Sequence, residues 1–154
     1  AMIRIATPNF FTDPAWALPA IIFLDRWHTL GFTVIIMLAG LQTVPVELIE
    51  AARTDGATSW QVFWKVTLPL MSPTMFFAMI ITFIGAFQVF EPIQIITKGG
   101  PQGSTTTIVM YLYEKGFQSF DMGYAAAVAI LVFLIVMGVT LLQFMGRRKW
   151  VHEA

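Results

Sequence analysis

Hydrophobic side chains in this chain form three long runs, and polar or turn-forming residues separate them. The runs cover residues 16–41, 73–96 and 124–145. A helix needs ~20 residues, at ~1.5 Å of rise each, to cross the hydrocarbon layer of a membrane, so each run is long enough. The pattern predicts an all-α, polytopic membrane protein with three transmembrane helices.

Charged residues inside these runs are few and unevenly placed. The first run contains Asp25, Arg26 and His28, the second ends in Glu91 and Pro92, and the third carries no charge. An ionised group is costly in lipid, so such residues usually face protein or a water-filled path. We expect the first two helices to face protein or water over part of their length.

The connection between the first two runs carries the signals of two short helices. Pro45 suits a first helical position, and Gly56 suits the left-handed residue that stops a helix. Thr58 or Ser59 can cap the second helix. That helix should end at Leu68-Pro69, because proline interrupts helical hydrogen bonding. The expected order is helix, glycine bend, helix.

The second connection, residues 97–123, opens with Gly99-Gly100-Pro101, which favours a turn. Aromatic and apolar residues then recur on one helical face between Ile108 and Phe120. Tyrosines are favoured where a membrane meets water. We expect an extracytoplasmic loop that contains a short surface helix.

The basic residues indicate which connection is cytoplasmic, because cytoplasmic segments beside spans carry an excess of lysine and arginine. With the first connection and the C-terminus inside, five basic residues are cytoplasmic: Arg53, Lys65, Arg147, Arg148 and Lys149. Three are outside: Arg4, Lys98 and Lys115. This bias favours a cytoplasmic first connection.

The composition of the chain excludes several kinds of partner and site. Hydrophobic residues make up 57% of the 154 residues and charged residues 12%, and the net charge of +0 gives no sign of a nucleic-acid partner. The absence of cysteine excludes disulfides and thiolate chemistry. His28 and His152 are too far apart in sequence to suggest a metal site, and no phosphate-binding loop is present. We expect no catalytic residue, metal or cofactor, and therefore no enzyme.

Within the first connection, residues 43–70, Glu50-Ala51-Ala52 is followed by Asp55-Gly56-Ala57 and then by Thr67-Leu68-Pro69-Leu70. This set, placed between two spans, resembles the EAA motif of the permease subunits of binding-protein-dependent ABC importers. Three flanking stretches resemble the carbohydrate-uptake branch of that family: residues 38–42, 97–101 and 120–127. The resemblance covers essentially the whole chain.

The resemblance implies a fold and a set of partners. Members usually have about six spans, so we expect this chain to be the C-terminal part of a longer permease in the cytoplasmic (inner) membrane of a prokaryote. Expected partners are a separate ATP-binding subunit that hydrolyses ATP, a second permease subunit, an extracytoplasmic solute-binding protein, a carbohydrate substrate and membrane lipid. The first connection would be the cytoplasmic coupling element that docks on the ATPase. Its expected coupling residues are Glu50, Ala51, Ala52, Asp55, Gly56, Trp60, Phe63 and Pro69.

A helical spacing places Trp60, Phe63, Trp64 and Thr67 on one face of the second short helix. Such a face exposes more apolar surface than we expect of a solvated loop. A helix resting on lipid headgroups would explain it, and so would a protein partner. The motif favours the protein partner.

Polar and small residues within the spans are candidates for the substrate pathway. Asp25, His28, Thr29 and Phe32 share one face of the first helix. A second stripe has the same spacing, with a glutamine beside it: Thr82, Gly85, Ala86, Gln88 and Val89. Two structural alternatives stay open, namely pairing of Asp25 and Arg26 with other helices and close packing through the small residues.

The predicted function is the transmembrane part of an ATP-driven importer that moves a sugar by alternating access. An importer of glycerol phosphate or another small solute is one alternative. A helical membrane scaffold that transports nothing is another. Asp25 on the pathway face favours a neutral cargo over an anionic one.

Overall fold

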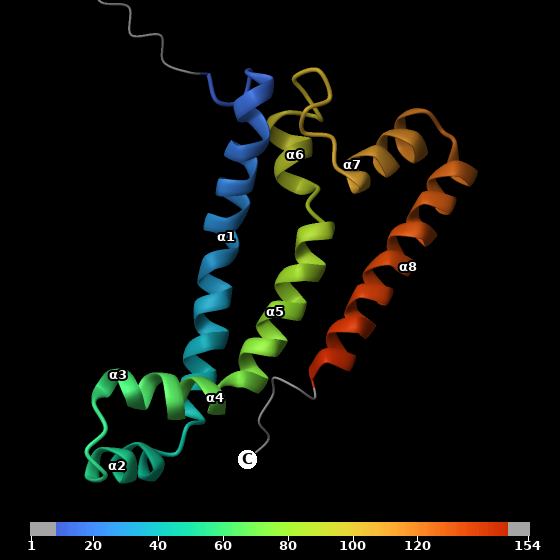
Figure 1. The fold of residues 1–154 in the computed structure, drawn as a ribbon. Coiled ribbons are helices and arrows are strands. Elements are labelled where there is room, and N and C mark those ends of the chain that lie inside the picture. The colour runs from blue at the N-terminus through green and yellow to red at the C-terminus, as the bar shows by residue number, and fades with distance from the viewer. Residues whose placement is uncertain (1–8, 148–154) are drawn as a thin grey trace, which may run out of the picture. The chain divides into compact units, whose positions relative to one another are not determined.

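A computed structural model describes residues 9–147 of the chain. That part contains three segments that are long and apolar enough to cross a membrane: Pro14–Gln42, Ser72–Ile96 and Met122–Arg147. Every regular element in the described part is helical (Figure 1). The predicted all-α fold with three transmembrane segments is therefore confirmed. Four residues named above, Arg4, Arg148, Lys149 and His152, lie outside the described residues.

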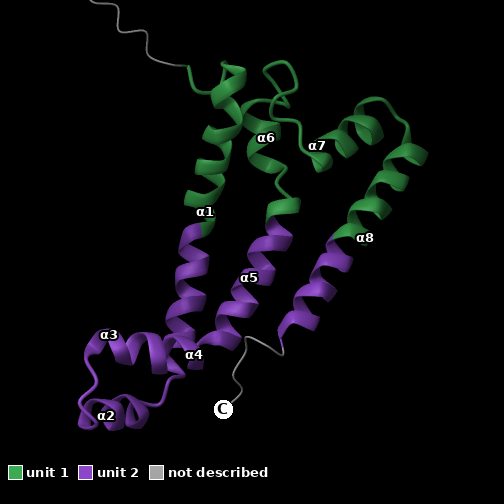
Figure 2. Cartoon of the chain, viewed as in Figure 1, with its two compact units in different colours: residues 1–29, 86–135 green, residues 30–85, 136–154 purple. Residues whose placement is uncertain are grey.

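The chain divides into two compact units (Figure 2). Unit 1 comprises residues 1–29 and 86–135, and unit 2 comprises residues 30–85 and 136–154. Helix α1, Pro14–Gln42, begins in unit 1 and ends in unit 2. Each unit is described separately below.

In unit 2 the first connection forms helices α2, Val46–Thr54, and α3, Ser59–Val62. Pro45 is the N-cap of α2 rather than its first helical residue. Gly56 has φ +82°, so the predicted left-handed stop is confirmed. Thr58 caps α3, and its side chain and backbone both take part in a capping box.

The second short helix does not end at Leu68-Pro69, so that prediction was wrong. After α3 the chain forms a π-helical turn, η1, at Phe63–Thr67, then the short helix α4, Leu68–Leu70, before α5, Ser72–Phe87. The N–H of Leu68 donates to the carbonyl of Phe63, five residues earlier. This wider turn lets the chain pass a proline that would clash with the carbonyl of a regular helix.

Unit 1 contains α6, Glu91–Ile96, α7, Ile108–Tyr113, the π-helical turn η2, Glu114–Gln118, and the start of α8, Met122–Arg147. Its buried apolar core consists of Ile21, Ile93 and Met110. These side chains come from α1, α6 and α7, so the core joins all three helices.

The second membrane segment is interrupted. Helix α5 ends at Phe87 and α6 begins at Glu91, where the sequence predicted one continuous helix. Pro92 lies in the first turn of α6 and has no N–H to donate to the carbonyl of Gln88. The proline therefore lies at the start of a separate helix, α6, and not at the end of one continuous membrane helix.

Within unit 2, helices α1 and α5 approach closely at Gly40 and Thr74. A Cβ at Gly40 would lie 2.6 Å from the Cγ2 atom and 2.7 Å from the Cβ atom of Thr74. Such distances do not occur between real carbon atoms, so this contact requires glycine. Small residues allow this kind of approach between membrane helices.

We expect Gly40→Ala to destabilise the protein by about 1–3 kcal/mol, the usual effect of overpacking. Gly31→Ala on the same helix is the control, because a Cβ there meets no atom within 4 Å. The exchange Gly40→Ala with Thr74→Gly should restore most of the stability. Thermal unfolding in detergent measures all three variants, and equal midpoints for Gly40→Ala and Gly31→Ala would contradict the contact.

Candidate coupling surface and substrate pathway

The candidate coupling residues of α2 lie on an open surface in unit 2. Glu50, Ala51, Asp55 and Gly56 are exposed, and Ala52 is half-buried. No residue of α2 is buried. A nine-residue helix with this much exposed surface gains little from its own unit and leaves a face open to a partner.

A pocket of about 350 Å³ opens between α2 and the helix that follows it. It brings together three candidate coupling residues, Ala52, Asp55 and Gly56, with residues that were not among the predicted coupling residues. These are Ala57, Gln61, Val62, Lys65 and Val66. The bend at Gly56 turns the two helices toward each other and so creates the concave side. Asp55 places a negative charge in the lining of this pocket, and Lys65 places a positive charge there.

Three aromatic side chains form a cluster on α3 and η1. Trp60 is 71%, Trp64 50% and Phe63 41% exposed. The ring centroids of Trp60 and Trp64 are 5.6 Å apart, as are those of Phe63 and Trp64. Trp64 was not among the predicted coupling residues. The cluster is a contiguous apolar surface with no covering element in the described part of the chain.

Thr67 is not part of that surface, although its spacing predicted it. Its exposed fraction is only 6%. A π-helical turn has more residues per turn than an α-helix, so η1 rotates Thr67 away from the aromatic face. Pro69, the last candidate coupling residue, is half-buried in α4.

On α1, Asp25 and Arg26 form an ion pair with a distance of 2.7 Å between the carboxylate and the guanidinium. The side chain of Asp25 is 16% exposed and that of Arg26 is 42% exposed. The pair joins adjacent residues of one helix, whereas the structural alternative above assigned their partners to other helices. The carboxylate and guanidinium therefore neutralise each other locally.

The other candidates on this face of α1 differ in their hydrogen bonding and exposure. The hydroxyl of Thr29 donates to the backbone carbonyl of Asp25 at 2.9 Å. His28 and Phe32 are exposed, and Phe32 retains 58% of its accessible surface. An imidazole and an aromatic ring are thus available to a ligand or to another helix.

The candidates in the second segment divide at the end of α5. Thr82, Gly85 and Ala86 are exposed on the helix. Gln88 and Val89 fall in the interruption between α5 and α6, with Gln88 exposed and Val89 packed against the core of unit 1. The sequence selected Val89 by helical spacing and Gln88 as a residue beside that stripe, and neither choice anticipated the interruption.

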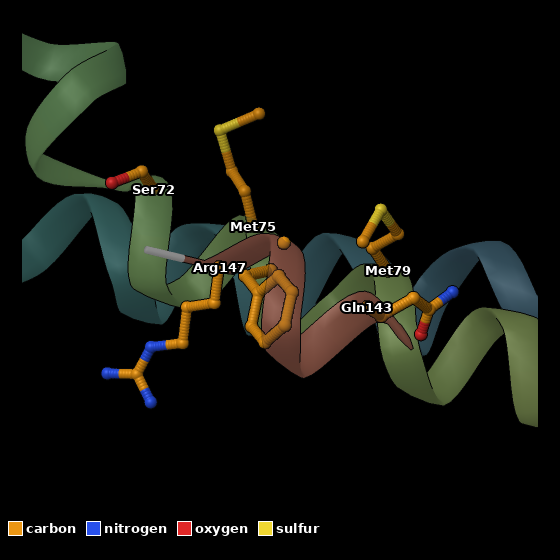
Figure 3. A pocket seen from close by; sticks show the side chains of 7 residues that line it. Ser72, Met75, Met79, Gln143 and Arg147 are labelled. Carbon is orange, nitrogen blue, oxygen red and sulfur yellow. The ribbon is translucent and has the colours of Figure 1, made fainter. Parts of the chain in front are cut away.

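A second pocket, of about 490 Å³, lies in unit 2 between α5 and α8 (Figure 3). Methionine and phenylalanine side chains from α5 line one side, and Gln143 and Arg147 of α8 line the other. None of the predicted pathway residues contributes to it. The pocket is almost entirely apolar, so it suits lipid or a packed helix better than a sugar.

Among residues 9–147, no three histidine, aspartate or glutamate side chains are placed to hold a metal ion.

Residues 2–151 match the model of a family described as binding-protein-dependent transport system inner membrane component. The chain is 41% identical over 131 residues to the sulfoquinovosyl glycerol transport system permease protein SmoG of Agrobacterium fabrum, covering 85% of this chain and 42% of that protein. It is 36% identical over 141 residues to the trehalose/maltose transport system permease protein MalF of Thermococcus litoralis, covering 92% and 48%.

A third relative is named for a different cargo. The chain is 36% identical over 137 residues to the sn-glycerol-3-phosphate transport system permease protein UgpA of Rhizobium meliloti, covering 88% of this chain and 47% of that protein. The chain thus spans about half the length of these curated relatives.

Proposed function

The chain belongs to the family of binding-protein-dependent transport system inner membrane components, and we propose that it is the part of an importer permease that couples ATP hydrolysis to carbohydrate movement. A separate ATP-binding subunit hydrolyses the ATP, a second permease subunit completes the pathway, and an extracytoplasmic solute-binding protein delivers the cargo. The permease alternates between outward and inward openings. It supplies surfaces for binding and docking and carries out no chemistry on the cargo.

The observation that supports coupling most directly is the exposed surface of the first connection. Trp60, Phe63 and Trp64 present exposed apolar rings on α3 and η1, and α2 presents exposed charged residues. An exposed apolar patch of this kind is typical of a protein interface. Glu50 offers a charge to a basic residue of the ATPase, and the small Ala51 permits close approach.

A neutral cargo fits the pathway better than a phosphate ester. Arg26 is the neighbour of Asp25 in the α1 stripe, and its guanidinium already pairs with that carboxylate. A phosphate would have to compete with that carboxylate for the guanidinium, and the carboxylate would repel it. A sugar needs no net charge and gains from an aromatic face and hydrogen-bonding groups, which Phe32 and His28 provide. The glycerol phosphate named for one relative is therefore the second candidate.

The coupling proposal predicts the behaviour of two variants. Gly56→Val forces a β-branched residue to φ +82° and should reduce transport by about tenfold or more, the scale of 1–3 kcal/mol of backbone strain. Glu50→Ala should reduce transport severalfold and weaken retention of the ATPase, because one charge of the interface is lost. Uptake and co-purification of the ATPase measure both effects.

Two control variants accompany these changes. Glu47→Ala removes a charge from the first turn of the same helix, and Gly138→Val adds the same side chain where a Cβ meets no atom within 4 Å. Both should insert and transport normally. Normal uptake with Glu50→Ala and Gly56→Val would refute the docking role.

The pathway proposal predicts that Asp25→Ala and Phe32→Ala lower ATP-driven uptake of a neutral disaccharide by about tenfold while the complex stays intact. Uptake of sn-glycerol 3-phosphate by the unchanged protein should be much weaker. If Asp25 acts only as the partner of Arg26, then Asp25→Ala should lower the yield of the complex, because the guanidinium loses its neutralising partner within a membrane segment. The double variant Asp25→Ala with Arg26→Ala should then recover it.

Reconstituted vesicles with the ATPase and the solute-binding protein allow both measurements. Full disaccharide uptake by Asp25→Ala and Phe32→Ala would remove this face of α1 from the pathway. An intact complex with no ATP-driven uptake by the unchanged protein would favour the scaffold.

A further inference from the structure

The interruption of the second membrane segment has its own hydrogen-bond partner. The side-chain hydroxyl of Thr107 donates to the backbone carbonyl of Val89 at 2.9 Å. A carbonyl that leaves the helical ladder inside a membrane has no bulk water to accept from, so another group of the protein must satisfy it. Thr107, 18 residues later in the chain, does so.

The same hydroxyl also caps α7. It accepts a hydrogen bond from the backbone N–H of Met110 at 3.3 Å, and the backbone of Thr107 has the extended conformation of an N-cap. A hydroxyl has one hydrogen to donate and two lone pairs. One side chain can therefore hold the start of α7 against the interruption between α5 and α6.

The surroundings of this hydrogen bond are apolar. Ile93 is 0% and Met110 1% exposed, and Val89, Phe90 and Tyr113 pack against them. The ring centroids of Phe90 and Tyr113 are 5.0 Å apart. The hydrogen bond is partly buried against this core, so its loss costs more than at a fully exposed position.

The loop that leads to Thr107 is held by hydrogen bonds of its own. Thr105 is 1% exposed and its hydroxyl donates to the carbonyl of Gly100 at 2.7 Å. The hydroxyls of Thr97 and Thr105 are 2.8 Å apart. The hydroxyl of Thr106 donates to the carbonyl of Gly99 at 3.2 Å. These contacts stay inside the loop, whereas that of Thr107 reaches the second membrane segment.

We propose that Thr107 is a positioning residue for the substrate pathway: its hydroxyl fixes the carbonyl of Val89, in the peptide that joins Val89 to Phe90, and so restrains the backbone of the interruption beside the exposed Gln88. This inference rests on the proposed function for its consequence, but the geometry itself involves only unit 1. Gln88 follows the last residue of α5, and the chain after it is not helical until Glu91. The hydrogen bond to the carbonyl of Val89 restrains this non-helical stretch.

Three variants test the role of the hydroxyl. Thr107→Val keeps the shape and removes the hydroxyl, Thr107→Ser keeps the hydroxyl, and Thr106→Val removes the neighbouring hydroxyl whose bond stays in the loop. In the assembled transporter we expect Thr107→Val to raise the apparent KM for disaccharide uptake by about three- to tenfold, the factor expected for one hydrogen bond. Thr107→Ser and Thr106→Val should stay within about twofold of the unchanged protein. A fall in complex yield and maximal rate at unchanged KM would show a merely structural cap and would overturn the proposal.

A second readout does not depend on transport. The chain has no cysteine, so Gln88→Cys introduces a single thiol whose rate of reaction with a small reagent reports its exposure. Thr107→Val should change that rate severalfold, and Thr106→Val should not. An unchanged rate in Thr107→Val would overturn the positioning role even if the apparent KM rises. If the unchanged complex shows no ATP-driven uptake but the rate responds to Thr107→Val, the proposed function fails while the positioning of Gln88 stands.

Discussion

Inside a membrane every backbone N–H and carbonyl must find a partner within the protein, and this requirement shapes the second segment of the chain. Pro92 cannot donate to the carbonyl of Gln88, so α5 ends early and α6 begins anew. The carbonyl of Val89 is then satisfied by the hydroxyl of Thr107. A different solution serves Pro69, where a π-helical turn carries the chain past the ring.

The two proposed tasks of the chain place different demands on its surface. Docking on an ATPase needs exposed groups on a firm support, and α2 and α3 provide this through the bend at Gly56 and the cap at Thr58. A pathway needs polar groups that do not carry a net charge through the membrane. The ion pair of Asp25 with Arg26 meets that demand by neutralising a carboxylate within one helix.

Sequence reasoning predicted the features that follow from local rules. The three spans follow from hydrophobic length, and the stop at Gly56 follows from the conformational freedom of glycine. It could not predict the π-helical turn that buries Thr67 or the side-chain contact between Thr107 and Val89. Both features depend on which groups satisfy the backbone hydrogen bonds near Pro69 and Pro92 in the folded chain. The coupling and pathway residues were chosen from motif and spacing, and they stay predictions.

The sidedness of the two connections tests the whole account most directly, because coupling requires α2 and α3 in the cytoplasm and cargo delivery requires residues 97–123 outside. Ser59 and Ser119 are exposed, and serine to cysteine is a small change in a chain without cysteine. In intact cells an impermeant thiol reagent should label Ser119→Cys and leave Ser59→Cys unlabelled until the membrane is opened. Labelling of Ser59→Cys but not Ser119→Cys in intact cells would contradict the account.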